Sequence, residues 1–165
     1  DSREVVLEKL GYLDSAGELK KSRYFTTNFF EVRGVFEESR MANVSLDYFS
    51  DKLYQIEFWD RTCSALDVDG YIKYVIYNRL EPMFTDVYGP PTQEWEYPNF
   101  AEVIQQDQPV AQWDLKKKII TLLVEEYELK YGPVILIQDK ELLERKQVEE
   151  EGKAEELQEK TKSDF

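Results

Sequence analysis

The 165-residue chain contains no histidine and one cysteine, Cys63. The absence of histidine excludes Ser-His-Asp and Cys-His catalysis, histidine-ligated zinc and imidazole general-base chemistry within this chain. A single cysteine excludes an internal disulfide and a metal site built from several cysteines. Cys63 lies in RTCSALD, where Arg61 is the nearby cation, so we expect a half-buried structural thiol rather than a nucleophile.

Long apolar runs and basic residues are also scarce. No run approaches the roughly 20 apolar residues that a membrane span needs, so we expect none. The chain has 21 Lys and Arg against 34 Asp and Glu, a net charge of −13. Such a charge disfavours nucleic-acid phosphates and anionic lipids, so we expect no nucleic-acid partner, while a basic protein partner stays open. Solubility alone also explains the charge.

What the chain has is a composition suited to a folded core. Hydrophobic residues make up 42% and aromatic residues 14%, including eleven Tyr and nine Phe. That content is too rich in β-forming aromatics for a disordered chain, and 165 residues can bury a sizeable core. We therefore expect one α+β domain over residues 1–138, followed by a charged helix or tail over residues 139–165.

The stretch from Asp69 to Pro91, DGYIKYVIYNRLEPMFTDVYGPP, predicts a helix. Its apolar residues recur at intervals of three and four, which gives one continuous apolar side. These residues are Ile72, Val75, Ile76, Leu80, Met83 and Phe84. Asp69 is placed to cap the start, Gly89 to end the helix in a left-handed conformation, and Pro90-Pro91 to prevent continuation. Strand-like blocks precede and follow this helix, so we expect it to cover a sheet.

Alternation of apolar and polar residues predicts three strands on each side of that helix. Their ranges are 24–36 with a bend at Gly34, 42–48, 53–59, 111–115, 118–127 and 134–138. Ser50-Asp51-Lys52 is a tight connection, which predicts a hairpin. The strand 118–127 is apolar on both sides near its middle, so we expect an inner strand covered on both faces. Residues 12–22 and 130–133 are turn-like.

Two more helices are expected, one at each end. A capping box at Asp1 and Glu4, followed by apolar residues and Gly11, predicts a short helix over residues 2–10. From Asp139 onward acidic and basic residues dominate, with a thin apolar stripe that suits a helix interrupted at Gly152. This helix could extend into solvent, pack on another chain as a coiled coil, or lie on its own domain.

The resulting order predicts an α+β fold made of two successive αβββ units, roughly 2–59 and 70–138. Three strands of each unit expose one apolar face that the preceding helix can cover. Two such units side by side make one mainly antiparallel sheet with its helices on one face.

Four phrases carry a resemblance to a known group: SREVVLEKLG, VSLDYFSDKLYQIEFW, YIKYVIYNRLEPMFTDVYGPPT and AQWDLKKKIITLLVEEY. Over about residues 1–138 the chain resembles small bacterial envelope and lipoprotein domains with a β-lactamase-inhibitory-protein-like or SmpA/OmlA-like fold. The resemblance implies an exported, periplasmic or cell-surface binding or scaffolding domain without catalysis or cofactor, with a lipid anchor possible upstream of residue 1. The long 92–109 segment and the acidic tail depart from the group's pattern.

Five carboxylates cluster in sequence around the first hairpin, which could suggest acid–base chemistry or a Ca²⁺ site. They are Asp47, Asp51, Glu57, Asp60 and Asp67. Their spacing matches no EF-hand loop, and solvated strand faces explain them without chemistry. We therefore predict no catalytic and no metal-binding residue.

The aromatic residues Trp59, Trp95, Tyr97 and Phe100 are the predicted partner-binding residues. Trp59 falls on the polar side of its strand, and the other three lie in the polar segment 92–109, whose length is typical of a mobile or functional loop. Exposed aromatics beside acidic residues suit protein-binding surfaces, although rings that plug a sheet edge would show the same pattern.

The sequence thus predicts a non-enzymatic domain that works through protein–protein contact. The alternative is an acidic inhibitor, an immunity protein or a nucleic-acid mimic, whose carboxylates would block a basic partner in the cytoplasm. The oligomeric state stays open.

Overall fold

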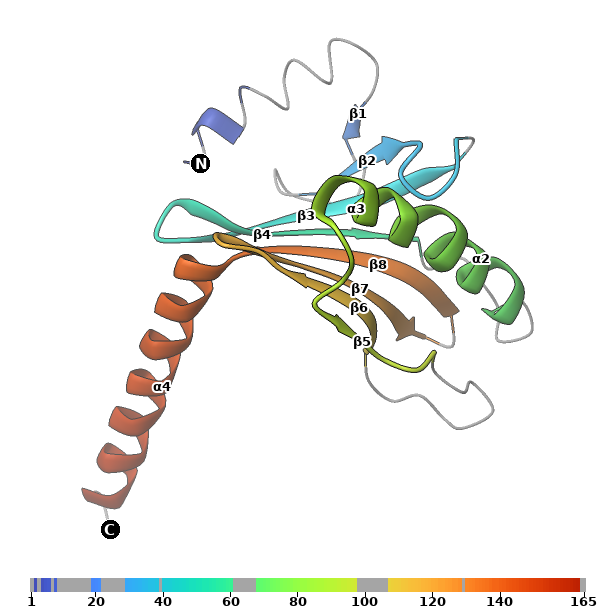
Figure 1. The fold of residues 1–165 in the computed structure, drawn as a ribbon. Helices are drawn as coiled ribbons and strands as arrows, with labels where there is room; N and C mark the ends of the chain where they lie inside the picture. The colour runs from blue at the N-terminus through green and yellow to red at the C-terminus, as the bar shows by residue number, and fades with distance from the viewer. Residues whose placement is uncertain are drawn as a thin grey trace.

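The computed structural model describes residues 2, 4–6, 8, 19–21, 29–38, 40–60, 68–97, 107–128 and 130–163. Its eight strands form one antiparallel sheet (Figure 1). The strands are β1 (Leu19–Lys21), β2 (Phe29–Arg33), β3 (Met41–Phe49), β4 (Lys52–Trp59), β5 (Gln93–Glu94), β6 (Gln108–Asp114), β7 (Lys118–Tyr127) and β8 (Lys130–Asp139). The predicted α+β class is therefore confirmed.

The spatial order of the strands is β1-β2-β3-β4-β8-β7-β6-β5. Each half of the sheet is a run of four strands in chain order, and the last strand of each half, β4 and β8, join the halves. The two predicted units thus lie side by side, but each contributes four strands rather than three. The short edge strands β1 and β5 fall in segments expected to be turn and loop.

One helical segment runs from Val68 to Tyr88 across a face of the sheet (Figure 1). It consists of the wide turn η1 (Val68–Ile72), α2 (Lys73–Val75), a second wide turn η2 (Ile76–Leu80) and α3 (Glu81–Tyr88). It ends as predicted at Gly89, whose φ of 83° suits a residue without a Cβ. Asp69 lies inside η1 rather than ahead of it, so its predicted role as the cap is wrong.

The apolar side of this segment follows steps of four residues. Ile72, Ile76, Leu80 and Phe84 are buried. Wide turns close hydrogen bonds over five residues rather than four, which keeps residues four apart near one line. Val75, one residue before Ile76, is also fully buried, whereas Met83, predicted to be part of the stripe and one residue before Phe84, is 48% exposed.

The buried core lies between this segment and the strands beneath it. Its sheet side is formed by Ala42, Val110, Ala111, Trp113, Ile120, Leu122, Val124 and Ile135. Trp113 is fully buried, packs 5.4 Å from the ring of Phe84 and donates from Nε1 to the carbonyl of Gly89 over 2.8 Å. Trp113 of the sheet therefore contacts both the apolar side of the helical segment and its C-terminal end. Full burial of each large apolar side chain contributes about 2 kcal/mol.

The first described helical residues add a smaller cluster on the same face. Val6 is buried against Val44 and Leu46 of β3. The amide of Val6 donates to the carbonyl of Ser2 over 3.1 Å, and Ser2 pairs with Lys52. The predicted helix over 2–10 is therefore confirmed at residues 4–6 and 8, whereas Ser2 forms an isolated bridge instead.

The last helix, α4 (Lys140–Ser163), follows β8 directly and leads away from the sheet (Figure 1). Asp139 caps it by accepting a 3.0 Å hydrogen bond from the amide of Leu142, which is buried. The helix continues through Gly152, so the predicted interruption is wrong. Glycine in a helix interior costs about 1 kcal/mol, which the rest of a long helix can absorb. None of the described helices is long and apolar enough to cross a membrane.

Candidate binding surface

The open face, meaning the sheet face opposite the segment 68–88, carries the side chains that alternate with the core. The strand register arranges them in three rows across the sheet. The rows are Asp47, Gln55, Gln138, Ile119, Asp114; then Ser45, Glu57, Leu136, Thr121, Gln112; then Asn43, Trp59, Val134, Leu123, Pro109. Among the residues that the structure describes, both buried clusters that include helical residues lie on the other face.

Trp59 lies on the open face, as its parity predicted. It is half-buried opposite Val134 of β8, whereas its neighbour Phe58 packs against the core. Val134 and Leu123, next in the same row, expose only 2% and 8%. The accessible apolar surface of the row is therefore chiefly the indole, with half-buried Leu136 beside it in the next row.

Amide side chains connect the strands on this face. Gln55 donates to Asp47 Oδ2 over 3.0 Å and accepts from Gln138 Nε2 over 2.9 Å, which joins β3, β4 and β8. Gln112 Nε2 donates to the hydroxyl of Thr121 over 3.1 Å. These bonds fix the orientation of the polar groups, so the surface is rigid and mixed in polarity rather than a dry apolar patch.

Among the remaining predicted contact aromatics, Tyr97 does not share a surface with Trp59. Tyr97 lies on the helical side, with its ring centroid 5.8 Å from that of Tyr77 and 5.4 Å from Lys73 Nζ. Trp95 is half-buried, and its amide donates to the carbonyl of Val110 over 2.9 Å, which extends the pairing beyond β5. Phe100 lies outside the described residues. Tyr97 thus behaves as a ring that packs at a sheet edge.

Burial and neighbouring carboxylates raise the pKa of Glu81 and of Tyr77. Burial raises the pKa of Glu81, and the charge of Glu94 raises it further. Burial likewise raises the pKa of Tyr77, with Glu81 and Glu94 adding to the effect. Both shifts include an effect of Glu94, which lies in the edge strand β5.

The described carboxylates of the cluster around the first hairpin lie in different parts of the fold. Asp47 and Glu57 lie in different rows of the open face, and Asp51 lies in the β3–β4 turn, where Ser50 and Asp51 both have positive φ. Asp60 is buried, accepts a hydrogen bond from Tyr71 and forms an ion pair with Arg40. Asp67 and Cys63 lie outside the described residues. Within the described part of the chain, no three Asp, Glu or Cys side chains are grouped to hold a metal ion.

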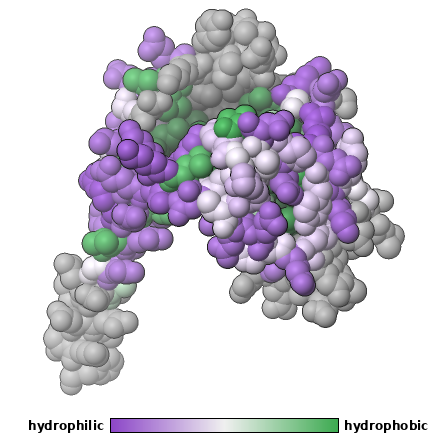
Figure 2. Space-filling view, in the orientation of Figure 1, coloured by the Kyte–Doolittle hydropathy of each residue, from purple (hydrophilic) through white to green (hydrophobic). Residues whose placement is uncertain are grey.

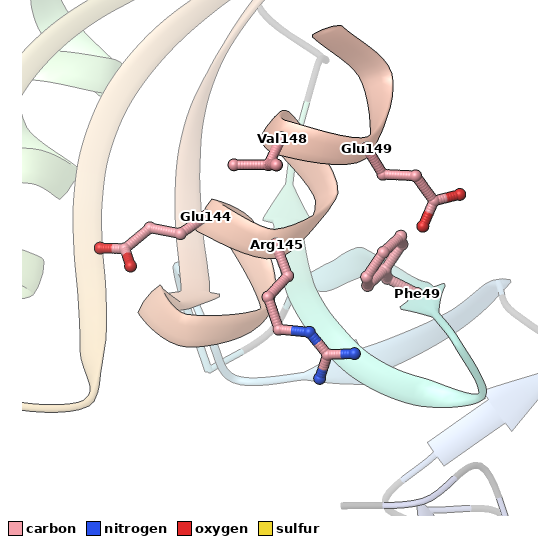
Figure 3. Close-up of a pocket in the computed structure, with 5 residues that line it drawn as sticks. All are labelled: Phe49, Glu144, Arg145, Val148 and Glu149. Carbon is pink, nitrogen blue, oxygen red and sulfur yellow. The ribbon is translucent and has the colours of Figure 1, made fainter. Parts of the chain in front are cut away.

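A groove of about 450 Å³ lies where α4 passes the tip of the first hairpin. Its walls are Phe49, Glu144, Arg145, Val148 and Glu149 (Figure 3). Arg145 and Glu149 reach toward Phe49 in Figure 3, and the guanidinium carbon of Arg145 lies 6.0 Å from the ring. Val148 is 69% exposed. In Figure 2 the described part of α4 is mostly hydrophilic and stands apart from the body of the molecule across a hollow.

The rows of the open face depend on which strands pair, and the sequence alone did not predict that pairing. Leu136 and Gln112 join the surface of Trp59 only because β8 inserts between β4 and β7. The alternation of side chains along each strand could be read from the sequence, and it predicted the face of Trp59 correctly. No protein-family model matches this chain, and no curated protein or solved structure is significantly similar to it.

Proposed function

We propose that this chain is a non-enzymatic binding domain that contacts a protein partner through the open face of its sheet. The bacterial envelope is the proposed setting, on the resemblance of its sequence phrases to small envelope domains. The observation that carries the proposal is the open face itself, an indole and a leucine set among fixed amide and carboxylate groups.

Such a surface has the composition of a protein interface. Interfaces combine a few large apolar anchors with oriented polar groups, and Trp is among the residues that most often dominate the binding energy. The hydrogen bonds of Gln55 and Gln112 hold the polar groups in place before binding, which limits the entropy lost on association.

The test is the affinity of the partner for matched variants. A partner captured by the wild-type chain is purified and titrated calorimetrically against wild type, Trp59→Ala and Tyr74→Ala. Tyr74 is an exposed aromatic, 53% exposed, on the opposite side of the sheet, so Tyr74→Ala controls for loss of a ring. Trp59→Ala should weaken binding by about 2 kcal/mol, roughly 30-fold, and Tyr74→Ala should not. Equal affinities for wild type and Trp59→Ala would contradict the proposal.

An acidic inhibitor is the second candidate function, and the charge of the open face favours it. Five carboxylates on this face outnumber the basic side chains described there, Arg33, Lys52 and Lys130. The carboxylates are Glu31, Asp47, Glu57, Asp114 and Glu125. Together with the net charge of −13, they would attract a basic surface.

Ionic strength separates the two candidates. Binding led by Trp59 and Leu136 should change little between 50 mM and 500 mM salt, because apolar burial is not screened. Binding led by carboxylates should weaken steeply over the same range, because the screening length falls to a few ångströms. The titration above, repeated across that range, decides which candidate holds.

A further inference from the structure

Asp60 is the meeting point of three segments that are distant in the sequence. It follows β4 directly, and its side chain is 3% exposed. Its Oδ2 accepts a 3.0 Å hydrogen bond from the hydroxyl of Tyr71 in η1. The same oxygen forms a 3.2 Å ion pair with Nη1 of Arg40, which lies just before β3. The guanidinium carbon of Arg40 also lies 4.3 Å from the ring centroid of Tyr71.

The β2–β3 connection, residues 34–38 and 40, is closed on itself and attached to the helical segment. The amide of Gly34 donates to the carbonyl of Arg40, and the amide of Arg40 to that of Glu37, both over 3.1 Å. Arg79 Nη2 donates to the carbonyl of Gly34 over 3.5 Å. Phe36 is 1% exposed within the core that includes Ile72, Val75 and Ile76. Helix and connection therefore share both apolar and polar contacts.

We propose that the β2–β3 connection and the start of the helical segment form an interlock around Asp60, so that the two open together. If η1 leaves the sheet, Asp60 loses the hydroxyl of Tyr71. If the connection leaves, Asp60 loses the guanidinium of Arg40. A buried carboxylate that loses a partner is strongly destabilised, so the departure of one segment lowers the cost of releasing the other.

The interlock therefore couples the conformations of the two halves of the sheet. Arg40 and Asp60 belong to the first half, whereas Tyr71 begins the helix that precedes the second half. Asp60 also donates from its amide to the carbonyl of Pro133 in β8 over 3.4 Å. One side chain thus couples β4, β8, the connection and the helix. The interlock does not depend on the proposed function.

Native-state hydrogen exchange on Tyr71→Phe and Arg40→Met tests the interlock. Each change is conservative, since Phe keeps the ring and Met keeps the aliphatic stem. Each variant should raise exchange about fivefold or more in both residues 34–38 and residues 68–76. Tyr74→Phe, on the same helix, and Arg33→Met, on β2, are the matched controls and should leave both regions unchanged.

The double variant Arg40→Met/Tyr71→Phe gives the decisive comparison. Both partners bind the same carboxylate, so their effects are coupled, and the combined increase should differ from the product of the two single increases. The interlock is overturned if Tyr71→Phe affects only the helix and Arg40→Met only the connection. It is equally overturned if the two increases multiply. Arg40→Lys, a milder change, provides the same readout should Arg40→Met fail to fold.

Discussion

Asp60 is the one charged residue among those described that is buried, exposing 2% of its surface. Its ion pair with Arg40 differs from the exposed pairs of α4, such as Lys153 with Glu149. Exposed pairs contribute little because water screens them and both side chains lose rotamer freedom. Removing a partner of a buried carboxylate, in contrast, lowers stability strongly, because the charge is left without compensation. At the scale of residues, burial therefore decides which polar contact matters.

Tyr71 provides a test of this cluster by pH. Burial raises its pKa, and the negative charge of Asp60 raises it further, although the cation of Arg40 opposes the shift. Above pH 10 the unfolded chain releases the proton of Tyr71 while the folded chain keeps it. Stability should therefore fall as the pH rises above 10, up to the raised pKa, and Tyr71→Phe should remove this part of the loss.

Urea unfolding at pH 8, 9, 10 and 11 measures this effect. The stability advantage of wild type over Tyr71→Phe should shrink from pH 9 to pH 11. The difference between wild type and Tyr74→Phe serves as the reference for a lost hydroxyl on the same helix. A wild-type advantage that stays constant or grows across this range would show that Asp60 does not hold Tyr71 in its neutral form.

Single residues were predictable where one strand or helix determines their surroundings. The parity of β4 placed Trp59 on the open face, and Gly89 ended the helix as expected. Tyr97 was not predictable, because its contacts with Tyr77 and Lys73 depend on how residues after β5 meet the helix. The cluster of Asp60 was missed for the same reason, since its members are 11 and 20 residues apart in the sequence.

Among the elements, α4 depends least on the core. Its first turns are held by the cap at Asp139 and by the ion pair of Lys140 with Asp114 over 2.5 Å. Farther along, Arg145 lies 6.0 Å from the ring of Phe49 and Lys146 Nζ 5.2 Å from the ring of Tyr54. Within the helix, ion pairs join Lys146 with Glu150 and Lys153 with Glu149. Helices without an apolar face depend on propensity and such pairs, so α4 should respond to propensity more than any core helix.

Gly152→Ala is the corresponding prediction. Nothing lies within 4 Å of a Cβ added at Gly152, so alanine should fit. The change should stabilise α4 locally by about 0.5–1 kcal/mol. Far-UV circular dichroism should show more helix, and exchange of amides on either side of residue 152 should slow. Gly89→Ala, at a φ of 83°, is the opposite control and should destabilise the protein. Unchanged exchange in Gly152→Ala would mean that α4 is held by contacts other than its own propensity.

The sequence predicted β7 to the residue and β3 and β4 to within one residue of each end, because strong alternation marks them. It missed β1 and β5, which have three and two residues and exist only through pairing with β2 and β6. The predicted last strand starts at residue 134, whereas β8 starts at Lys130, because Gly132-Pro133 is typical of a turn. The chain reverses earlier, where Glu128 has a φ of 52°, and Pro133 pairs with Val124 inside the ladder.

The described part of the molecule is a single sheet with one face covered by the segment 68–88, and the other face is the one proposed to bind a partner. The halves meet along β4 and β8, where Trp59 lies opposite Val134 and Glu57 opposite Leu136. The centre of the open face thus combines residues from both halves. Neither half alone would present this surface, so the joining of the two strands is the structural basis of the proposed function.

Side-chain footprinting of the complex tests this claim most directly. A photogenerated carbene labels the chain alone and with its captured partner, and mass spectrometry locates the label. The account predicts that the partner protects Trp59, Leu136 and Gln112, while Tyr74 and Val87 on the helical segment are labelled equally in both samples. Protection of Tyr74 and Val87 with Trp59 unchanged would contradict it.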